Sequence, residues 1–358
     1  MTHFLNDILR QPDTLKRTID FLLGTGRAAL DAATAAIRDA RHVYLTGIGS
    51  SWHAALTAGP LLHLGACPVH MLDVAELLEF ATIPPDSAII VISRSGRSVE
   101  VVNLLAKFRN TPTTVIAITN SEDGPLAREA QISIVVPIDL DHAISVNTYS
   151  TLAATAGILA SAAIGTWNST LATSLSRTVE KTASAIPAWQ EQIADSSWLS
   201  LGSTYYFLAR GSSLGSCHEA RLLWEEGVKS PATAMGTGGF RHGPQEMVSQ
   251  DVRFGMWIDR ERVRAQDLAV ARDLRKLGAS VMLIGQDLPM DAGDLVLRLP
   301  PALPDWQFLI DIIPAQLAAE RLARLSGVDC DSFRYCSFIV EDEYGLLSEQ
   351  AGTPKDKK

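Results

Sequence analysis

Three serines in one short segment have the right chemistry and spacing to bind an anion. Ser93, Ser95 and Ser98 follow an apolar stretch, residues 88–92, and precede a helical apolar pattern. Where a strand gives way to a helix, hydroxyls and free backbone N–H groups converge, and the helix N-terminus favours negative charge. Helix capping and turn formation explain Ser98 alone, but explain all three serines poorly. The segment, including Arg94, therefore predicts a phosphate site.

A second kind of turn occurs twice in the chain. Gly49-Ser50-Ser51 and Gly211-Ser212-Ser213 each end an apolar strand pattern and begin a helical one. Either turn alone fits an ordinary strand-to-helix connection, but the pair suggests one architecture built twice. We expect Gly49, Ser50 and Ser51 to line the phosphate site. The Gly-Lys-Ser/Thr ending of a nucleotide P-loop and a complete GxGxxG are both missing, which disfavours ATP and NAD.

Carboxylates and a histidine in the second half could move protons. Glu219, Glu225 and Glu226 precede His242, which lies in the segment 238–244. Interconversion of an aldose and a ketose needs one group to open the sugar ring and another to carry a proton between C1 and C2. By themselves these residues also fit a solvated helix face and a loop histidine, but the serine segment favours the chemical interpretation.

Other chemistries have less support in the sequence. The remaining histidines form no HxxxH or HExxH pair, so no metal site is predicted. No Gly-x-Ser-x-Gly elbow follows a strand, which argues against a serine hydrolase. The net charge of −9 and the absence of a basic run argue against nucleic-acid binding.

Composition indicates an ordinary water-soluble enzyme-sized chain of 358 residues with 47% hydrophobic residues. Its four cysteines have no CxxC spacing, which fits reduced thiols, and the N-terminus lacks the pattern of a signal peptide. The most apolar segment, residues 152–167, is short for a bilayer span and is predicted to be a buried helix. We expect a cytoplasmic protein that does not contact a membrane.

The order of the expected elements predicts an α/β fold with two doubly wound parallel sheets in tandem, each in a three-layer αβα arrangement. A helix is expected over residues 14–40, and Pro187 is expected to break or kink a helix over residues 171–194. Strands are expected at residues 43–45, 69–72, 88–92, 114–118, 132–136, 205–208, 232–235, 252–258, 280–284 and 295–299.

We divide the chain into five parts on this pattern. They are an N-terminal helical segment (1–40), a first domain (41–168), a bridging helix (169–197), a second domain (198–345) and a polar, disordered tail (346–358).

From about residue 42 to residue 340 the chain resembles the sugar isomerase (SIS) family in its two-copy form. Ser93–Ser98 is similar to the family's Ser-x-Ser-Gly-x-Ser/Thr phosphate loop, and Phe240–Pro244 is similar to its histidine loop. Within the family the sequence most resembles the isomerase half of glucosamine-6-phosphate synthase and stand-alone amino-sugar and ketose phosphate deaminases and isomerases.

This resemblance implies roles for individual residues. The hydroxyls at Ser51, Ser93, Ser95 and Ser98 would bind the phosphate of a sugar, and the region from Ser145 to Asn147 would line the sugar. Glu226 falls on the family's glutamate base and His242 on its ring-opening histidine. In the family that histidine comes from a neighbouring subunit, so a homodimer is implied, with no metal or organic cofactor.

The sequence also departs from the family pattern. Thr2 stands where the synthase's glutaminase domain has its cysteine nucleophile, Leu223 and Phe338 replace family lysines, and Gly239 replaces a glutamate. These departures affect the amine chemistry more than the phosphate end.

The resulting prediction is a phosphosugar isomerase or deaminase that acts on a hexosamine or ketohexose 6-phosphate, such as glucosamine 6-phosphate, through ring opening and an enediol. Two alternatives stay open at this point. One is a deglycase of fructosyl-amino-acid 6-phosphates, and the other is a non-catalytic sugar-phosphate sensor.

Overall fold

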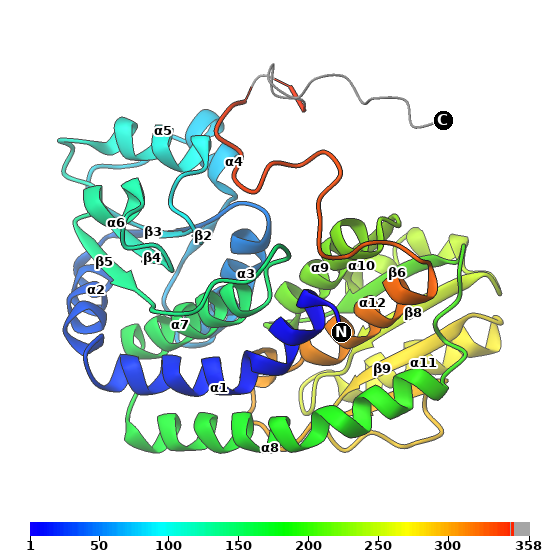
Figure 1. Cartoon of the computed structure of the whole chain (residues 1–358). Helices are drawn as coiled ribbons and strands as arrows, with labels where there is room; N and C mark the ends of the chain where they lie inside the picture. Colours follow the sequence, from blue (N-terminus) through cyan, green and yellow to red (C-terminus); the bar gives the residue numbers. More distant parts are fainter. Residues whose placement is uncertain (344, 347–358) are drawn as a thin grey trace.

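The computed structural model describes residues 1–343 and 345–346 and shows an α/β protein with two parallel five-stranded sheets (Figure 1). The predicted tail lies outside the described residues, apart from Leu346. The strands are β1 (His42–Thr46), β2 (His70–Met71), β3 (Ser87–Ile92), β4 (Thr114–Thr119), β5 (Ile132–Val135), β6 (Thr204–Ala209), β7 (Ala232–Gly236), β8 (Val252–Trp257), β9 (Ser280–Gly285) and β10 (Leu295–Arg298).

Helices cover the sheets and join the two halves. They are α1 (His3–Leu23), α2 (Arg27–Asp39), α3 (Ser50–Leu64), α4 (Val74–Phe80), α5 (Val99–Phe108), α6 (Pro125–Glu129), α7 (Asn147–Ala163), α8 (Ser169–Asp195), α9 (Ser213–Leu223), α10 (Thr237–Phe240), α11 (Arg264–Lys276) and α12 (Ile313–Leu325). A π-helix, η1 (Trp224–Val228), continues α9, and two 3₁₀ segments are η2 (Pro244–Met247) and η3 (Gln307–Leu309).

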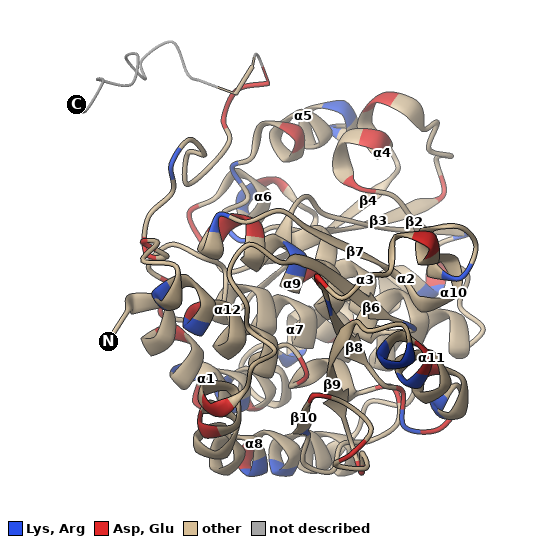
Figure 2. Cartoon of the chain, turned by 90° about the vertical axis from the view of Figure 1, so that its right-hand side faces the viewer, with Lys and Arg blue, Asp and Glu red and all other residues tan. Residues whose placement is uncertain are grey.

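The strands form where the sequence is almost continuously apolar. Apart from Arg253 and Arg298, the strands in the described part of the chain contain no Lys, Arg, Asp or Glu, and Figure 2 shows them nearly free of charge colours. Strands of this composition are stable only where helices cover both faces of a parallel sheet. All ten predicted strands are present within two residues of their expected ends.

The N-terminal region differs from its prediction, because one helix over residues 14–40 is replaced by α1 and α2. Thr2 caps α1 by accepting from Leu5 N, and the chain turns at Gly24 and Gly26. A Cβ at Gly26 would lie 2.5 Å from the ring of Phe21, so the turn packs closely against α1. The two glycines separate helices that share one apolar periodicity.

Of two long helices, α8 (Ser169–Asp195) departs from its prediction and α7 (Asn147–Ala163) follows it. Helix α8 continues through Pro187 to Asp195, so the proline does not break it. Helix α7 is buried along almost its whole length, which confirms the predicted buried helix. No helix in the described part of the chain is both long and apolar enough to cross a membrane.

The two halves share one topology. The sheet orders are β2-β1-β3-β4-β5 and, read in the matching direction, β7-β6-β8-β9-β10. The register also matches, because Ser93 N donates to Ile118 O after β3, and Ile258 N donates to Ile284 O after β8. Helices α3 and α9, which follow the two Gly-Ser-Ser turns, pack against each other between the sheets (Figure 1). Residues 258–263 are therefore the structural counterpart of residues 93–98.

Candidate functional site

A cavity of about 230 Å³ lies at the carboxyl edge of the first sheet. In a doubly wound α/β fold, ligands bind at this edge. Residues from both halves and from the C-terminal segment line the cavity: Ile48, Gly49, Ser50, Ser51, Ser93, Arg94, Ser95, Ser98, Glu100, Ala143, Ser145, Leu222, Glu226, Phe333, Cys336, Ser337, Phe338, Ile339 and Val340.

The turn after β1 brings backbone close to the cavity. Gly49 has φ +56°, a conformation that disfavours residues with a Cβ, and a Cβ at Gly47 would lie 2.7 Å from the backbone of Ser51. The turn therefore places the first turn of α3, with Ser50 and Ser51, against the cavity. The first N–H groups of a helix lack intrahelical acceptors, so they are available to an anion.

The loop after β3 is held by its own hydroxyls. Ser93 Oγ accepts from Gly96 N at 3.1 Å, and Ser95 Oγ accepts from Arg97 N at 3.2 Å. A hydroxyl that accepts a hydrogen bond still has its own proton to donate. Both serines can therefore keep the loop in shape and still donate to a ligand oxygen in the cavity.

Ser98 occupies the N-cap position of α5, but its side chain makes no capping hydrogen bond. The capping explanation for this serine therefore does not hold in the structure. Its hydroxyl lines the cavity at the N-terminus of a ten-residue helix. That position is favourable for a negatively charged group.

Arg94 points its guanidinium at the C-terminal segment. Its Nη2 donates to Phe338 O at 2.7 Å, and its Cζ lies 4.2 Å from the centre of the Phe338 ring. Burial lowers the pKa of Arg94, while the nearby carboxylates of Asp141 and Glu226 act in the opposite direction. Among the described residues no carboxylate forms an ion pair with this guanidinium, so its positive charge is available to a ligand.

Glu226 lies in the π-helix η1, an element that is often found at functional sites. Burial raises the pKa of its carboxyl to about 7, and the negative charge of Glu219 adds to the rise, whereas Arg94 and Lys229 oppose it. A carboxyl with a pKa near neutrality can both accept and return a proton at physiological pH.

Glu219 and Glu225 have different surroundings from Glu226. Glu219 is buried, and its two oxygens accept from Ser50 Oγ at 2.6 Å and contact His53 Nδ1 at 2.7 Å. Glu225 forms an ion pair with Arg221 at 2.6 Å on the helix surface. The solvated-face interpretation thus fits Glu225, while Glu219 joins the two halves beside the cavity.

Not all predicted site residues meet at the cavity. Asn147 is fully buried, and its Nδ2 donates to Asp7 O and to Asp141 Oδ1, so the structure does not bring its side chain to the cavity. His242 lies in the turn between α10 and η2, is exposed, and is not among the lining residues. Ser145 does line the cavity.

The sequence did not indicate that residues 333–340 cover this cavity. Val99 N donates to Val340 O at 3.0 Å, which joins the segment to the N-terminus of α5. Lys229 Nζ donates to Ser332 O at 2.7 Å and to the carbonyl of Glu226. The one sequence feature that could have pointed to this segment is its apolar run at residues 338–340. In the structure this run forms no strand and lines the cavity.

The cavity offers few groups for covalent or metal chemistry. None of its lining residues, all within the described part of the chain, is a lysine, and Leu223 is buried in the core. Both Cys336 and Phe338 line the cavity in the C-terminal segment. Across the described residues no group of three or more His, Cys, Asp or Glu is arranged to hold a metal ion. The site is suited to binding an anion and moving a proton.

Residues 36–163 match the family model of the SIS domain. The chain is 24% identical to the glutamine–fructose-6-phosphate aminotransferase (isomerizing) of Pyrobaculum aerophilum over 95% of this chain and 58% of that protein. It is also 24% identical to the corresponding enzyme of Bacillus subtilis, over 84% of this chain and 51% of that protein. The chain thus spans little more than half the length of these relatives.

Solved structures share the fold at low sequence identity. The C-terminal domain of glucosamine-fructose-6-phosphate aminotransferase from Francisella tularensis aligns with a TM-score of 0.82 and 20% identity, over 92% of this chain and 98% of that chain. Glucosamine-6-phosphate deaminase from Thermotoga maritima aligns with a TM-score of 0.80 and 20% identity, over 95% and 99%. Tagatose-6-phosphate ketose/aldose isomerase from Escherichia coli aligns with a TM-score of 0.79 and 20% identity, over 92% and 94%.

The predicted resemblance is confirmed by these comparisons. The chain carries a SIS domain and is homologous to the isomerase half of glutamine–fructose-6-phosphate aminotransferase. The solved structures it resembles include phosphosugar isomerases and deaminases.

Proposed function

We propose that this protein is a phosphosugar isomerase or deaminase that acts on a hexosamine or ketohexose 6-phosphate of the glucosamine 6-phosphate and fructose 6-phosphate type. One observation supports this most strongly. A single cavity has serine hydroxyls and helix N-termini on one side and the carboxyl of Glu226, with a pKa of about 7, on the other. That combination suits a substrate that has a phosphate at one end and an exchangeable C–H proton at the other.

The phosphate would be held without bulk positive charge. The hydroxyls of Ser51, Ser93, Ser95 and Ser98 all line the cavity, and α3 and α5 both begin there. Hydroxyl donors and two helix N-termini stabilise a dianion by short-range interactions. Binding of this remote group fixes the reacting carbons relative to Glu226, which lowers the entropic cost of the chemical step.

The proton transfer requires Glu226 in its ionised form. Once the ring is open, the carboxylate removes the C2 proton of the aldose to give an enediol, or an enolamine from an amino sugar. The same carboxyl then returns the proton to C1. For glucosamine 6-phosphate the product is a ketimine, and its hydrolysis consumes water and releases ammonia and fructose 6-phosphate. Because no lysine lines the cavity, no protein Schiff base enters this sequence.

Ring opening is assigned to His242 of a second subunit. The exposure of this histidine and its absence from the cavity of its own chain fit a group that serves a neighbour. The proposal therefore includes a homodimer, and a tandem pair of SIS domains in which only the first binds the sugar phosphate. The matching sheet orders support the tandem arrangement.

The direct test is to incubate the purified protein with glucosamine 6-phosphate and to measure ammonia and fructose 6-phosphate. Glu226→Gln should reduce turnover by about 100-fold or more, since general-base catalysis contributes on that scale, while sugar-phosphate binding is largely kept. Glu225→Gln is the matched control, because Glu225 is ion-paired on the surface. Wild-type activity in Glu226→Gln would contradict the role of Glu226 as the base. No turnover of any ketose or amino-sugar phosphate in a panel would contradict the proposed enzymatic function.

A deglycase is the second candidate, and Arg94 is the observation that favours it. Arg94 lines the cavity together with Glu226, and no carboxylate in the described part of the chain forms an ion pair with its guanidinium. The carboxylate of an amino acid linked to the sugar at C1 would be a suitable partner. Turnover of a fructosyl-amino-acid 6-phosphate with release of the amino acid, faster than turnover of glucosamine 6-phosphate, would select this candidate. Binding of these compounds without any turnover would instead indicate a sensor.

A further inference from the structure

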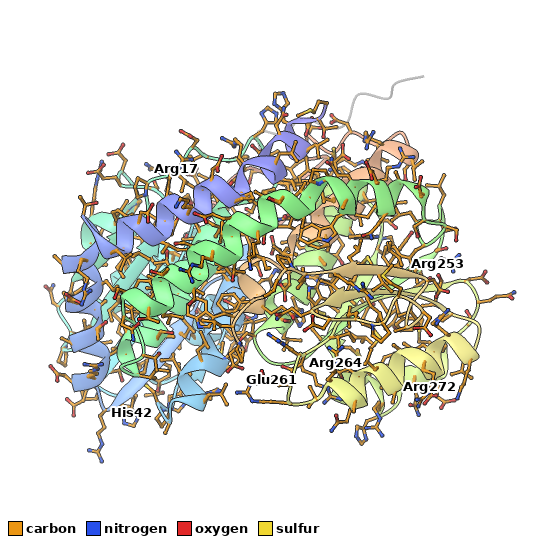
Figure 3. All side chains as sticks on the ribbon, turned by 90° about the horizontal axis from the view of Figure 1, so that it is seen from below. Arg17, His42, Arg253, Glu261, Arg264 and Arg272 are labelled. Atoms are coloured by element: carbon orange, nitrogen blue, oxygen red, sulfur yellow. The ribbon has the colours of Figure 1, made fainter. Side chains whose placement is uncertain are left out.

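A second cavity, of about 340 Å³, lies at the carboxyl edge of the second sheet. It occupies the place in the second half that the first cavity occupies in the first half. Its residues come from the last turn of α3, the turn after β6, the loop after β8 and the segment before α12: Pro60, His63, Leu64, Arg210, Gly211, Ser212, Ser213, Asp259, Arg260, Glu261, Arg262, Val263, Gln286, Leu303, Pro304, Asp305, Gln307 and Phe308. Figure 3 labels Glu261 and Arg264 at the end of α11 nearest the first half.

The same two helices line both cavities. Helix α3 begins at the first cavity with Ser50 and Ser51 and ends at the second with Pro60 and Leu64. Helix α9 does the reverse, because it begins at the second cavity with Ser213 and reaches the first with Leu222. The second cavity is thus formed by the same elements as the first, and its volume is in the range of small-molecule binding sites.

The loop that would bind phosphate in the second half is already occupied by a carboxylate of the protein. Asp259 Oδ1 accepts from the backbone N–H groups of Glu261, Arg262 and Val263 at 2.5 to 3.2 Å. A carboxylate has no proton to pass on to a ligand oxygen, and its charge repels an anion. This loop therefore does not accept a phosphate.

The arginines of the second cavity do not provide free positive charge. Arg210 pairs with Asp267 at 2.8 Å, Arg260 lies 3.6 Å from Asp287, and Arg262 pairs with Asp305. The three arginines that line the cavity are balanced by three lining acids, Asp259, Glu261 and Asp305. Electrostatics here favours a ligand without net charge.

Two buried polar atoms in this cavity have no hydrogen-bond partner. They are Ser212 Oγ and Gln307 Oε1, and both residues are 8% exposed. Ser213, the neighbour of Ser212, donates to Asp311 Oδ2, and Asp311 N donates to Gln307 O, so the residues that carry the two unpaired atoms are joined through Asp311. A hydroxyl can donate and an amide oxygen can accept. Because a buried polar group without a partner is destabilising, a ligand that hydrogen-bonds to both atoms would bind more tightly.

The rest of the wall is largely apolar, with Leu64, Val263, Leu303, Pro304 and Phe308 among its residues. A free sugar would bury many hydroxyls against such a wall without partners, which is unfavourable. We infer that the second cavity binds a neutral, mostly apolar molecule with one adjacent donor and acceptor, the pattern of a nucleobase or an aromatic amide. The inference is independent of the proposed function, because it uses no residue of the first cavity.

The test is a ligand-detected NMR titration of the full chain with adenine, uracil and nicotinamide. Molecules of this size should bind with dissociation constants of about 0.1–10 mM. Leu64→Trp should fill the mouth of the cavity and weaken the binding at least about tenfold. Leu201→Trp is the matched control, since Leu201 and Leu64 are similarly exposed, 60% and 56%, and Leu201 does not line the cavity.

A smaller change addresses the unpaired hydroxyl. Ser212→Ala removes one oxygen and should weaken binding about threefold to tenfold without a change in fold, as judged by circular dichroism. Three results would overturn the inference: no saturable binding of any of the three molecules, binding that Leu64→Trp leaves unchanged, or loss of fructose 6-phosphate binding in Leu64→Trp. The last would show that a phosphate ligand occupies this cavity.

Discussion

The loop after β3 and the loop after β8 have the same length, the same register and opposite electrostatic properties. In the first, Ser93 and Ser95 use hydroxyls to hold the loop, and each keeps a proton to donate. In the second, Asp259 holds the loop with a carboxylate that accepts three backbone N–H groups. The first loop leaves the positive potential of its helix N-terminus available to an anion, whereas in the second loop the carboxylate of Asp259 neutralises it.

The comparison shows how two halves with the same sheet topology can use one loop position differently, for stability in one half and for a free N-terminal charge in the other. In each loop a side chain accepts from backbone N–H groups of the same loop, which stabilises its shape. A loop whose N–H groups bond to a hydroxyl can still donate a proton to a phosphate oxygen. A loop whose N–H groups bond to a carboxylate cannot, and its negative charge repels the phosphate. Arg94 in the first loop stands at the position of Asp259 in the second, so a single position carries opposite charges in the two halves.

The largest effect is expected when the first loop is given the carboxylate of the second. Arg94→Asp should weaken binding of fructose 6-phosphate by about 100-fold or more, because the new carboxylate can accept the loop N–H groups and repels the phosphate. Calorimetric titration measures the affinity. Arg94→Gln separates loss of the guanidinium from gain of the carboxylate, and equal affinities of the two variants would contradict the comparison.

The pH profile is expected to show the next largest effect. Burial and Glu219 hold the pKa of Glu226 at about 7. The active carboxylate is present above this pKa, so kcat/KM should fall about tenfold per pH unit below it. Glu219→Gln removes a negative neighbour, lowers the pKa of Glu226 and should move the acid limb to lower pH. If the acid limb does not move, the limb belongs to another group and the assignment to Glu226 is wrong.

The serines of the first loop should differ from one another. Ser98→Ala should weaken sugar-phosphate binding about tenfold at unchanged stability, because the Ser98 hydroxyl makes no capping bond. Ser93→Ala should also lower the free energy of unfolding by about 1 kcal/mol, since Gly96 N loses its acceptor. Calorimetry and urea denaturation measure the two quantities. Equal losses of stability in both variants would contradict the assignment of loop stabilisation to Ser93 and not to Ser98.

The smallest effect is expected in the second loop. Asp259→Ser should reduce the free energy of unfolding by about 1–2 kcal/mol, the usual cost of losing a side chain that caps backbone N–H groups. Sugar-phosphate turnover should be unchanged. Asp259→Asn keeps an acceptor and should recover most of the loss in urea denaturation. A turnover defect in Asp259→Ser would mean that the two loops are not independent.

Much of the fold followed from local sequence patterns. The ten strands are short apolar runs that need no long-range information, and the serine segment follows its strand directly. The division of residues 14–40 at Gly24 was missed because both helices continue one apolar periodicity. The continuity of α8 through Pro187 depends on packing against α1 and α12, which overrides the local preference.

The site was less accessible to sequence reasoning, because its walls are distant in the chain. The bond from Arg94 to Phe338 O joins residues 244 positions apart, and no local pattern predicts it. The same holds for the burial that raises the pKa of Glu226. The bonds of Asp259 in the loop after β8 are local by contrast, because they reach only residues 261–263. Asn147 was placed near the sugar by its position, while its side chain is committed to Asp7 and Asp141.

The hydrogen bond from Val99 N to Val340 O makes one amide a reporter of the C-terminal segment. The first N–H of a helix has no acceptor within the helix, so its protection from deuterium depends on this one outside carbonyl. Exchange at Val99 should therefore follow the lifting of residues 333–340, while amides in the interior of α5 follow the opening of the helix itself. The exchange rate of this one amide would then report how often the cavity opens, without a label attached to the protein.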